Sequence, residues 1–146
     1  MLTASIQLPL PGLDLSLKPA TAYEPYRRYH LARQREMELQ LRQLRSKIRG
    51  LLSGVSPGLQ KLAALDAAFE HMLSERESKL FSTVPALLEK HFKQLLKEHA
   101  QDDPPHWLRT FGATLQSALL SELDVRLQPA MGLIEAYNDE MKNRHE

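Results

Sequence analysis

From residue 25 onward, apolar residues recur every three or four positions, the spacing that places side chains on one face of a helix. The first such segment begins at Pro25, which suits the first turn of a helix, and ends near Gly50 and Gly54. The near-heptad spacing predicts one long amphipathic helix. The positions that follow this spacing are Tyr26, His30, Arg33, Met37, Leu41, Leu44, Ile48, Leu51 and Val55.

A second amphipathic segment starts at Ser56-Pro57, where serine can cap a helix and proline fits its first turn. Because only a few residues separate the two segments, we expect them to pack as an antiparallel helical hairpin. The second stripe consists of Leu59, Leu62, Leu65, Phe69, Met72, Leu73, Arg76 and Leu80.

Proline marks the next boundary. Pro85 disfavours helical geometry at Val84, so a third helix is expected from about Pro85 to His99. The polar, proline-containing stretch 101–105 then predicts a linker.

The C-terminal part carries a further helical pattern that starts after this linker and reaches Leu127. Gln128 and Pro129 interrupt the pattern, because proline removes a helical hydrogen bond. A short last helix is therefore expected up to Tyr137, and the polar residues 138–146 are expected to fray as a tail.

Residues 1–24 differ from the rest of the chain, because prolines interrupt an alternating leucine pattern. They predict an extended N-terminal arm, either flexible or docked on a helical surface. Residues 25–137 are expected to form a single helical domain. The predicted fold is all-α, a long antiparallel helical hairpin followed by two or three shorter helices in a bundle-like arrangement. Gly112 and Gly132 lie inside helical patterns, where close helix packing is the expected reason for them.

Composition agrees with this fold, because aromatic residues make up only 6% of the chain and good helix formers dominate. The chain has 0 cysteines, which excludes disulfides and thiolate chemistry. It has no apolar run long enough to span a membrane, and its start lacks the positive region of a signal peptide. We therefore expect a cytoplasmic protein without membrane insertion.

The spacings that enzymes use are missing from the sequence. No histidine follows a glutamate by three residues, as carboxylate-bridged metal sites require, and no nucleophile elbow or P-loop occurs. His71 and Glu75 share a helix face, which is typical of a solvated pair. We expect no enzyme, no cofactor and no metal; a ligand site around His91 and His99 is a remote alternative.

Charge is distributed unevenly along the chain. Residues 24–52 carry eight Lys and Arg against three acids, a net +5, although the whole chain has a formal charge of +1. Such a helix could contact nucleic-acid phosphates. Alternatively, Arg42, Arg45 and Arg49 could pair with acids of the next helix, for which Glu70, Glu75 and Glu77 are the candidates.

Several strings together resemble a proteobacterial family known as domain-of-unknown-function family 3348. They are Tyr26-Arg27-Arg28-Tyr29 with Ala32-Arg33-Gln34, Leu62 to Ala67, Thr83 to Phe92, and Leu120 to Pro129 preceded by Trp107 and Phe111. The resemblance covers about Tyr26 to Ala136, and it implies no activity because the family has none assigned. It does imply a cytosolic accessory of an envelope complex of the proton-channel type.

The resulting hypothesis is a non-enzymatic helical interaction protein that self-associates through its long first hairpin, whose stripes exceed what two helices need. A nucleic-acid binder that uses the basic first helix is the alternative. The candidate interaction surface consists of Arg27, Arg28, Arg35, Arg42, Arg45 and Arg49 with Glu89, Lys90 and His91 at the corner that Pro85 defines.

Overall fold

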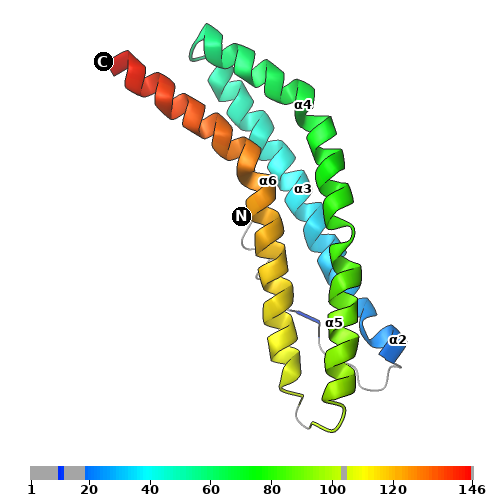
Figure 1. Cartoon of the computed structure of the whole chain (residues 1–146). Coiled ribbons are helices and arrows are strands. Elements are labelled where there is room, and N and C mark those ends of the chain that lie inside the picture. The colour runs from blue at the N-terminus through cyan, green and yellow to red at the C-terminus, as the bar shows by residue number, and fades with distance from the viewer. Residues whose placement is uncertain (1–9, 12–18, 103–104, 146) are drawn as a thin grey trace. The chain divides into compact units, whose positions relative to one another are not determined.

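The computed structural model describes residues 10–11, 19–102 and 105–145, and every regular element within them is a helix (Figure 1). The all-α prediction is therefore confirmed. The elements are α2 (Pro19–Ala22), α3 (Glu24–Ser53), α4 (Pro57–Phe81), α5 (Val84–Glu98) and α6 (Trp107–His145).

The chain divides into two compact units. Unit 1 consists of Met1–Met37 and Lys79–Glu122, and unit 2 of Glu38–Ser78 and Leu123–Glu146. Helices α3 and α6 therefore contribute their first parts to unit 1 and their second parts to unit 2. Each unit has its own core.

The turn between α3 and α4 forms where the sequence predicts it. The hydroxyl of Ser56 accepts a hydrogen bond from the Leu59 amide at 3.2 Å, so Ser56 caps α4 and Pro57 occupies its first turn. The side chain of Arg144 donates to the Val55 carbonyl at 2.7 Å, which joins the end of α6 to this turn. The α3–α4 hairpin of unit 2 is thus as expected.

Helix α6 differs from the prediction, because it continues through Pro129 to His145 as one helix of 39 residues. The expected interruption at Gln128 and Pro129, the separate last helix and the frayed tail are all wrong for the described residues. Pro129 removes one backbone hydrogen bond, but Arg126, Ala130 and Leu133 on either side of it are buried. Packing on both sides of the proline outweighs the lost bond.

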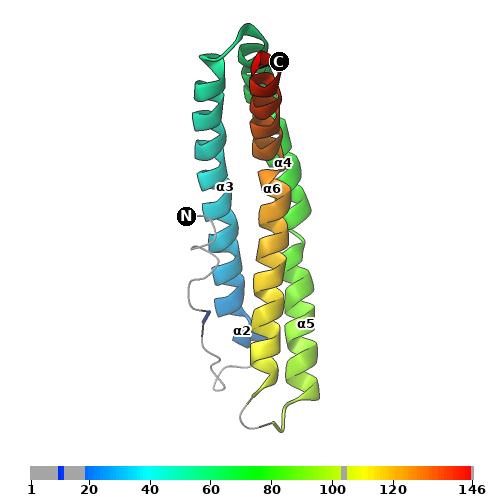
Figure 2. The same cartoon turned by 90° about the vertical axis from the view of Figure 1, so that its left-hand side faces the viewer.

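The core of unit 1 is an aromatic cluster to which α5 and α6 contribute beside the start of α3 (Figure 2). The ring of Phe92 lies 5.1 Å from that of Phe111, 5.3 Å from Trp107 and 5.3 Å from Tyr26, measured between centroids. Tyr23 joins the cluster, 5.4 Å from Phe92. Offset and edge-to-face contacts of this kind stabilise a core beyond the area they bury.

The core of unit 2 is smaller and aliphatic. Leu52, Leu59, Ala63 and Leu133 are buried together, and they come from α3, α4 and α6. Four partly buried residues pack against them, namely Ile48, Val55, Leu62 and Ala136. Helix α6 therefore covers part of the apolar stripes of α3 and α4 that a two-helix hairpin would leave exposed.

The predicted N-terminal arm lies mostly outside the described residues. Within the described part, Pro19–Ala22 is helical and Tyr23 is buried, so these residues do not form an extended arm. A Cβ atom at Gly112 would lie 2.8 Å from the side chain of Leu10, so the close contact at this glycine is with a residue outside the helices, whereas packing against a helix was expected. Nothing lies within 4 Å of the corresponding point at Gly132, so close packing does not explain that glycine.

Candidate interaction surface

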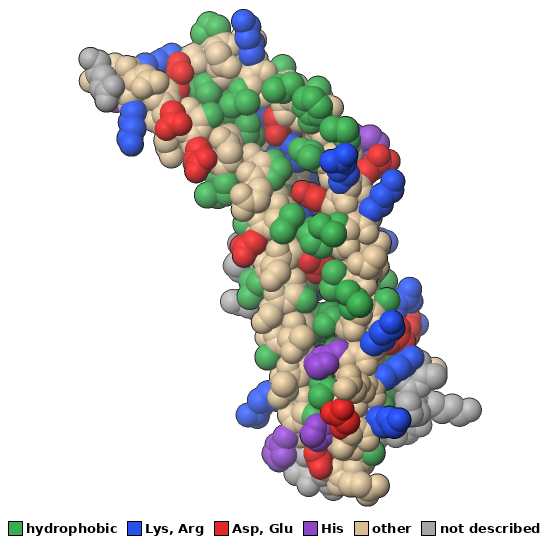
Figure 3. Space-filling view, in the orientation of Figure 1, with side chains coloured by type: hydrophobic (Ala, Val, Ile, Leu, Met, Phe, Trp, Pro, Cys, Tyr) green, Lys and Arg blue, Asp and Glu red, His purple; other side chains and the backbone are tan. Residues whose placement is uncertain are grey.

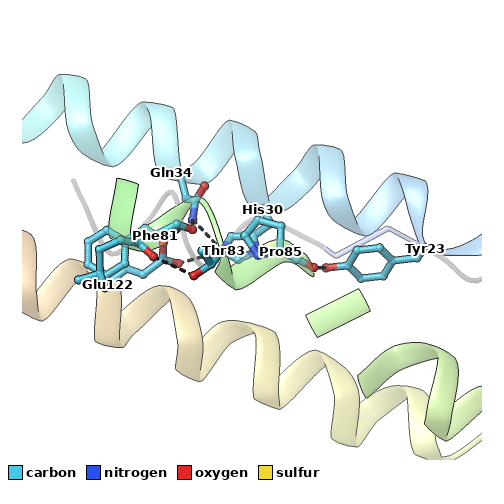
Figure 4. A network of polar contacts seen from close by, with 8 residues as sticks. Tyr23, His30, Gln34, Phe81, Thr83, Pro85 and Glu122 are labelled. Carbon is cyan, nitrogen blue, oxygen red and sulfur yellow. Dashed lines mark hydrogen bonds and ion pairs between the residues drawn. The ribbon is translucent and has the colours of Figure 1, made fainter. Parts of the chain in front are cut away.

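A buried polar layer connects three helices of unit 1 (Figure 4). His30 Nε2 lies 2.8 Å from one carboxylate oxygen of Glu122, and the Gln34 amide donates to the other oxygen. The same amide also donates to the Phe81 carbonyl at 3.1 Å. His30, Gln34 and Glu122 are exposed by only 0%, 8% and 3%. The layer therefore joins α3, α4 and α6 away from solvent.

His30 Nε2 lies within hydrogen-bond distance of two groups, the Glu122 carboxylate at 2.8 Å and the Gln34 amide nitrogen at 3.2 Å. Which of these groups donates depends on the tautomer of His30. Among the described residues, His30 Nδ1 is buried without a hydrogen-bond partner. The layer is thus a specific buried contact that holds helices together.

Tyr23 adds a second polar contact to unit 1. Its hydroxyl donates to the Pro85 carbonyl at 3.2 Å, so the corner before α5 is fixed to the start of α3 (Figure 4). The pKa of Tyr23 is raised to about 12, chiefly by burial and also by the nearby Glu89, while Arg27 opposes both effects. Tyr23 therefore stays a neutral donor at any physiological pH.

Ion pairs join α3 to α4 in unit 2. Arg45 contacts Asp66 at 2.7 Å, while Arg49 contacts Asp66 at 2.9 Å and Glu70 at 3.3 Å. Arg45 and Asp66 have side chains only 5% and 10% exposed, so this pair is largely desolvated. Removing one member of such a pair leaves an uncompensated buried charge. The network therefore fixes the register of the two helices.

A further pair joins α4 to α6 in the same unit. Arg126 lies 3.8 Å from Glu77, and the Arg126 side chain is 3% exposed. Burial raises the pKa of Glu77; the charges of Arg126 and Arg45 lower it, and that of Glu38 raises it. Sequence reasoning did not identify Asp66 or Arg126 as partners, because their opposite charges come from different helices.

The six arginines of the predicted basic surface do not share one environment. Arg45 and Arg49 pair across helices, as the structural alternative predicted, although Asp66 was not among the expected partners. Arg42 instead contacts Glu38 of its own helix at 3.4 Å. The expected partner Glu75 lies beside His71, at 3.7 Å, and Glu77 beside Arg126.

The remaining predicted site residues belong to unit 1. Arg27 and Arg28 are exposed, and both contact Glu24, at 3.7 and 3.6 Å. Arg35 is also exposed on the same helix, α3. On α5, Glu89 contacts Lys93 at 3.1 Å and Lys90 is exposed. His91 is half-buried, with its ring 6.3 Å from that of Phe111. Arg27 and Glu89 both lie near enough to Tyr23 to affect its pKa.

Unit 2 exposes apolar surface in two places. The first is a hollow of about 310 Å³ between α3 and α6. It is lined by Ile48, Leu51, Leu52, Val55, Ile134 and Tyr137. Leu51 is 70% exposed there. Apolar side chains gathered in this way mark binding surfaces more often than isolated ones do.

The second place is a stripe along α4, where Figure 3 shows hydrophobic side chains gathered on the surface. Leu65, Phe69 and Met72 are 53%, 45% and 45% exposed. These three residues belong to the second amphipathic stripe of the sequence, and the stripes of the hairpin exceed what two helices need. The buried face of α4 is instead the neighbouring one, which carries Asp66 and Glu70 toward α3.

Among the residues that the structure describes, no three His, Asp or Glu side chains gather in a way that could hold a metal ion. Within the same residues, no helix has the length and apolar character needed to cross a membrane.

The chain belongs to the family described as protein of unknown function DUF3348, whose profile matches residues 4–139. The match confirms the resemblance drawn from the sequence strings. It also extends that resemblance into the N-terminal arm, which the strings from Tyr26 onward did not cover. No curated protein and no solved structure matches the chain.

Proposed function

We propose that the protein is a non-enzymatic helical interaction protein of the cytoplasm that self-associates through unit 2. The observation that carries this proposal is the apolar surface of unit 2, formed by the hollow at Leu51 and the α4 stripe around Phe69. Because both surfaces consist of large side chains on rigid helices, a second protein surface could cover them at little cost in conformational entropy.

The polar layers support the same proposal. His30, Gln34 and Glu122 in unit 1, and Arg45 with Asp66 in unit 2, use their hydrogen-bonding groups to join helices. A buried polar layer of this kind specifies which helices pair and in which register. Such layers suit a scaffold that presents a defined surface to a partner.

Nucleic-acid binding receives less support from the structure. Arg42, Arg45 and Arg49 each contact an acid, which leaves fewer charges to neutralise phosphates than the count of arginines indicated. A short duplex titrated at low salt tests this alternative. Steeply salt-dependent binding that is lost when Arg27, Arg28 and Arg35 become Ala would favour it over self-association.

The family resemblance suggests where such a protein could act. We further propose that the partner of this protein is the cytosolic face of an envelope complex of the proton-channel type. Self-association and partner binding are separable, because the two apolar surfaces of unit 2 are formed by different helices.

Subunit mixing tests self-association directly. Two batches of the full chain carry a donor or an acceptor dye on a cysteine introduced at Asn143, since the natural chain has 0 cysteines. Mixing is expected to produce energy transfer. At least one of the two variants Leu51→Glu and Phe69→Glu should abolish the transfer, because a charge placed in the apolar contact surface disfavours association.

Leu87→Glu is the matched control, since Leu87 is 60% exposed on α5 of unit 1. It should leave the transfer unchanged. Absence of transfer in the natural sequence at high concentration would contradict the proposal, as would transfer that neither unit 2 variant alters.

A further inference from the structure

We infer that the α4 stripe is the self-association interface, and that two copies pack their α4 helices antiparallel about Ala68. The inference rests on the proposed function and deepens it by choosing between the two apolar surfaces of unit 2. It also predicts which residues meet across the interface.

The stripe has the heptad spacing of a coiled coil. Leu62, Leu65, Phe69 and Met72 alternate steps of three and four residues, so they occupy the two apolar positions of successive heptads. Leu62 is half-buried against the unit 2 core, so only part of its side chain is available to a second copy, and the other three are exposed. These four residues are enough for four apolar layers between two copies of the helix.

In an antiparallel arrangement, each apolar residue of the stripe faces an apolar residue of the second copy. Leu62 of one copy faces Met72 of the second copy, and Leu65 faces Phe69 of the second copy. The same two contacts then recur by symmetry, so a two-fold axis relates the copies. Each layer combines a large side chain with a smaller or more flexible one, which favours interdigitation.

Charge favours the antiparallel direction over the parallel one. Lys61 and Glu75 are exposed and flank the stripe on the same side. In the antiparallel register, Lys61 of each copy lies opposite Glu75 of the second copy. In a parallel pair, the flank that carries Lys61 and Glu75 would face the opposite flank of the second copy, so these two residues would not meet.

Ala68 is the residue at the symmetry axis. It lies on the same flank as Lys61 and Glu75, seven residues from each in sequence, and it is exposed. In the antiparallel register Ala68 faces Ala68 of the second copy. A small side chain at this position lets the two helices approach closely.

Position-specific cross-linking tests this register. Ala68→Cys gives the full chain a single thiol, which should form a disulfide with the second copy readily under mild oxidation, because the two positions face each other. Ala64→Cys is the matched control, since Ala64 is also exposed on α4 but lies away from the stripe. We expect cross-linking of the Ala68→Cys chain to be at least tenfold faster. Equal rates for the two variants would overturn the α4 interface.

Charge reversal provides a second measurement that needs no cysteine. Lys61→Glu or Glu75→Lys alone should weaken association by about tenfold, because each single change creates two repulsive pairs in the dimer. The double variant restores opposite charges and should associate like the natural chain. Lys47→Glu, an exposed change on α3, should have no effect.

The outcomes separate this inference from the proposed function. A dimer that tolerates both single reversals would overturn the α4 interface while leaving self-association intact, with the hollow at Leu51 as its remaining surface. A chain that stays monomeric in every experiment would overturn both.

Discussion

His30, Gln34 and Glu122 illustrate how single residues define unit 1. His30 follows the apolar spacing of α3 in the sequence, and it is fully buried there. Its partner Glu122 lies 92 residues away, so no local pattern could have predicted the pair. The candidate site residues chosen from sequence were instead the conspicuous arginines, several of which are occupied by ion pairs.

Removal of the Glu122 carboxylate is predicted to destabilise unit 1. Glu122→Ala leaves the Gln34 amide and the His30 ring nitrogen buried with one partner fewer, at a cost of about 3 to 5 kcal/mol. Glu122→Gln keeps an acceptor in place and should cost less than half as much. Urea unfolding followed by circular dichroism measures both. Glu75→Ala, at an exposed glutamate, is the control; equal losses for Glu122→Ala and this control would refute the role of the layer.

Tyr23 predicts a stability change at alkaline pH. Its pKa is raised from 10.0 to about 12 in the folded protein, chiefly by burial. An unfolded chain therefore releases this proton first, and stability falls as pH rises from about 10 to about 12. The expected loss is roughly 1 to 2 kcal/mol. Tyr23→Phe should reduce the slope of stability against pH in this window, and an unchanged slope would contradict the assignment.

At the scale of elements, the helix starts were more predictable than the helix interiors. Ser56 and Pro57 begin α4 as expected, because capping and proline geometry act over one turn. Pro129 was interpreted as a break, yet α6 continues through it. Whether a proline ends a helix depends on tertiary packing on either side, which the local sequence does not contain.

Replacement of Pro129 should stabilise α6. Pro129→Ala restores the backbone donor that proline lacks and relieves the ring contact with the preceding turn, so the free energy of unfolding should rise by about 1 to 3 kcal/mol. Pro57→Ala is the control, because proline costs nothing at a first turn and no gain is expected there. Thermal unfolding of the Pro129→Ala and Pro57→Ala variants measures the difference in stability. Destabilisation by Pro129→Ala would show that the proline makes a required contact.

The two interior glycines of α6 should respond differently to alanine. Gly132→Ala is expected to stabilise by about 1 kcal/mol, because nothing lies within 4 Å of the added Cβ. Gly112→Ala should gain less, since its Cβ would lie 2.8 Å from the end of the Leu10 side chain. Unfolding midpoints of the two variants provide the comparison, and an equal gain in both would indicate that Leu10 imposes no constraint.

At the scale of the whole molecule, two units with separate cores share the helices α3 and α6. Unit 1 buries an aromatic cluster, whereas unit 2 has a small aliphatic core and two exposed apolar surfaces. A unit with little buried apolar area gains most from covering more of it. This contrast supports the proposal that association takes place through unit 2.

Sedimentation equilibrium of the unmodified full chain, beside Phe69→Glu, tests the central claim most directly. Over a wide concentration range, the natural chain should shift from the mass of one chain toward twice that mass, and Phe69→Glu should remain at one. Circular dichroism should show the same helix content in both. A natural chain that stays at the mass of one chain at the highest concentration would contradict the account.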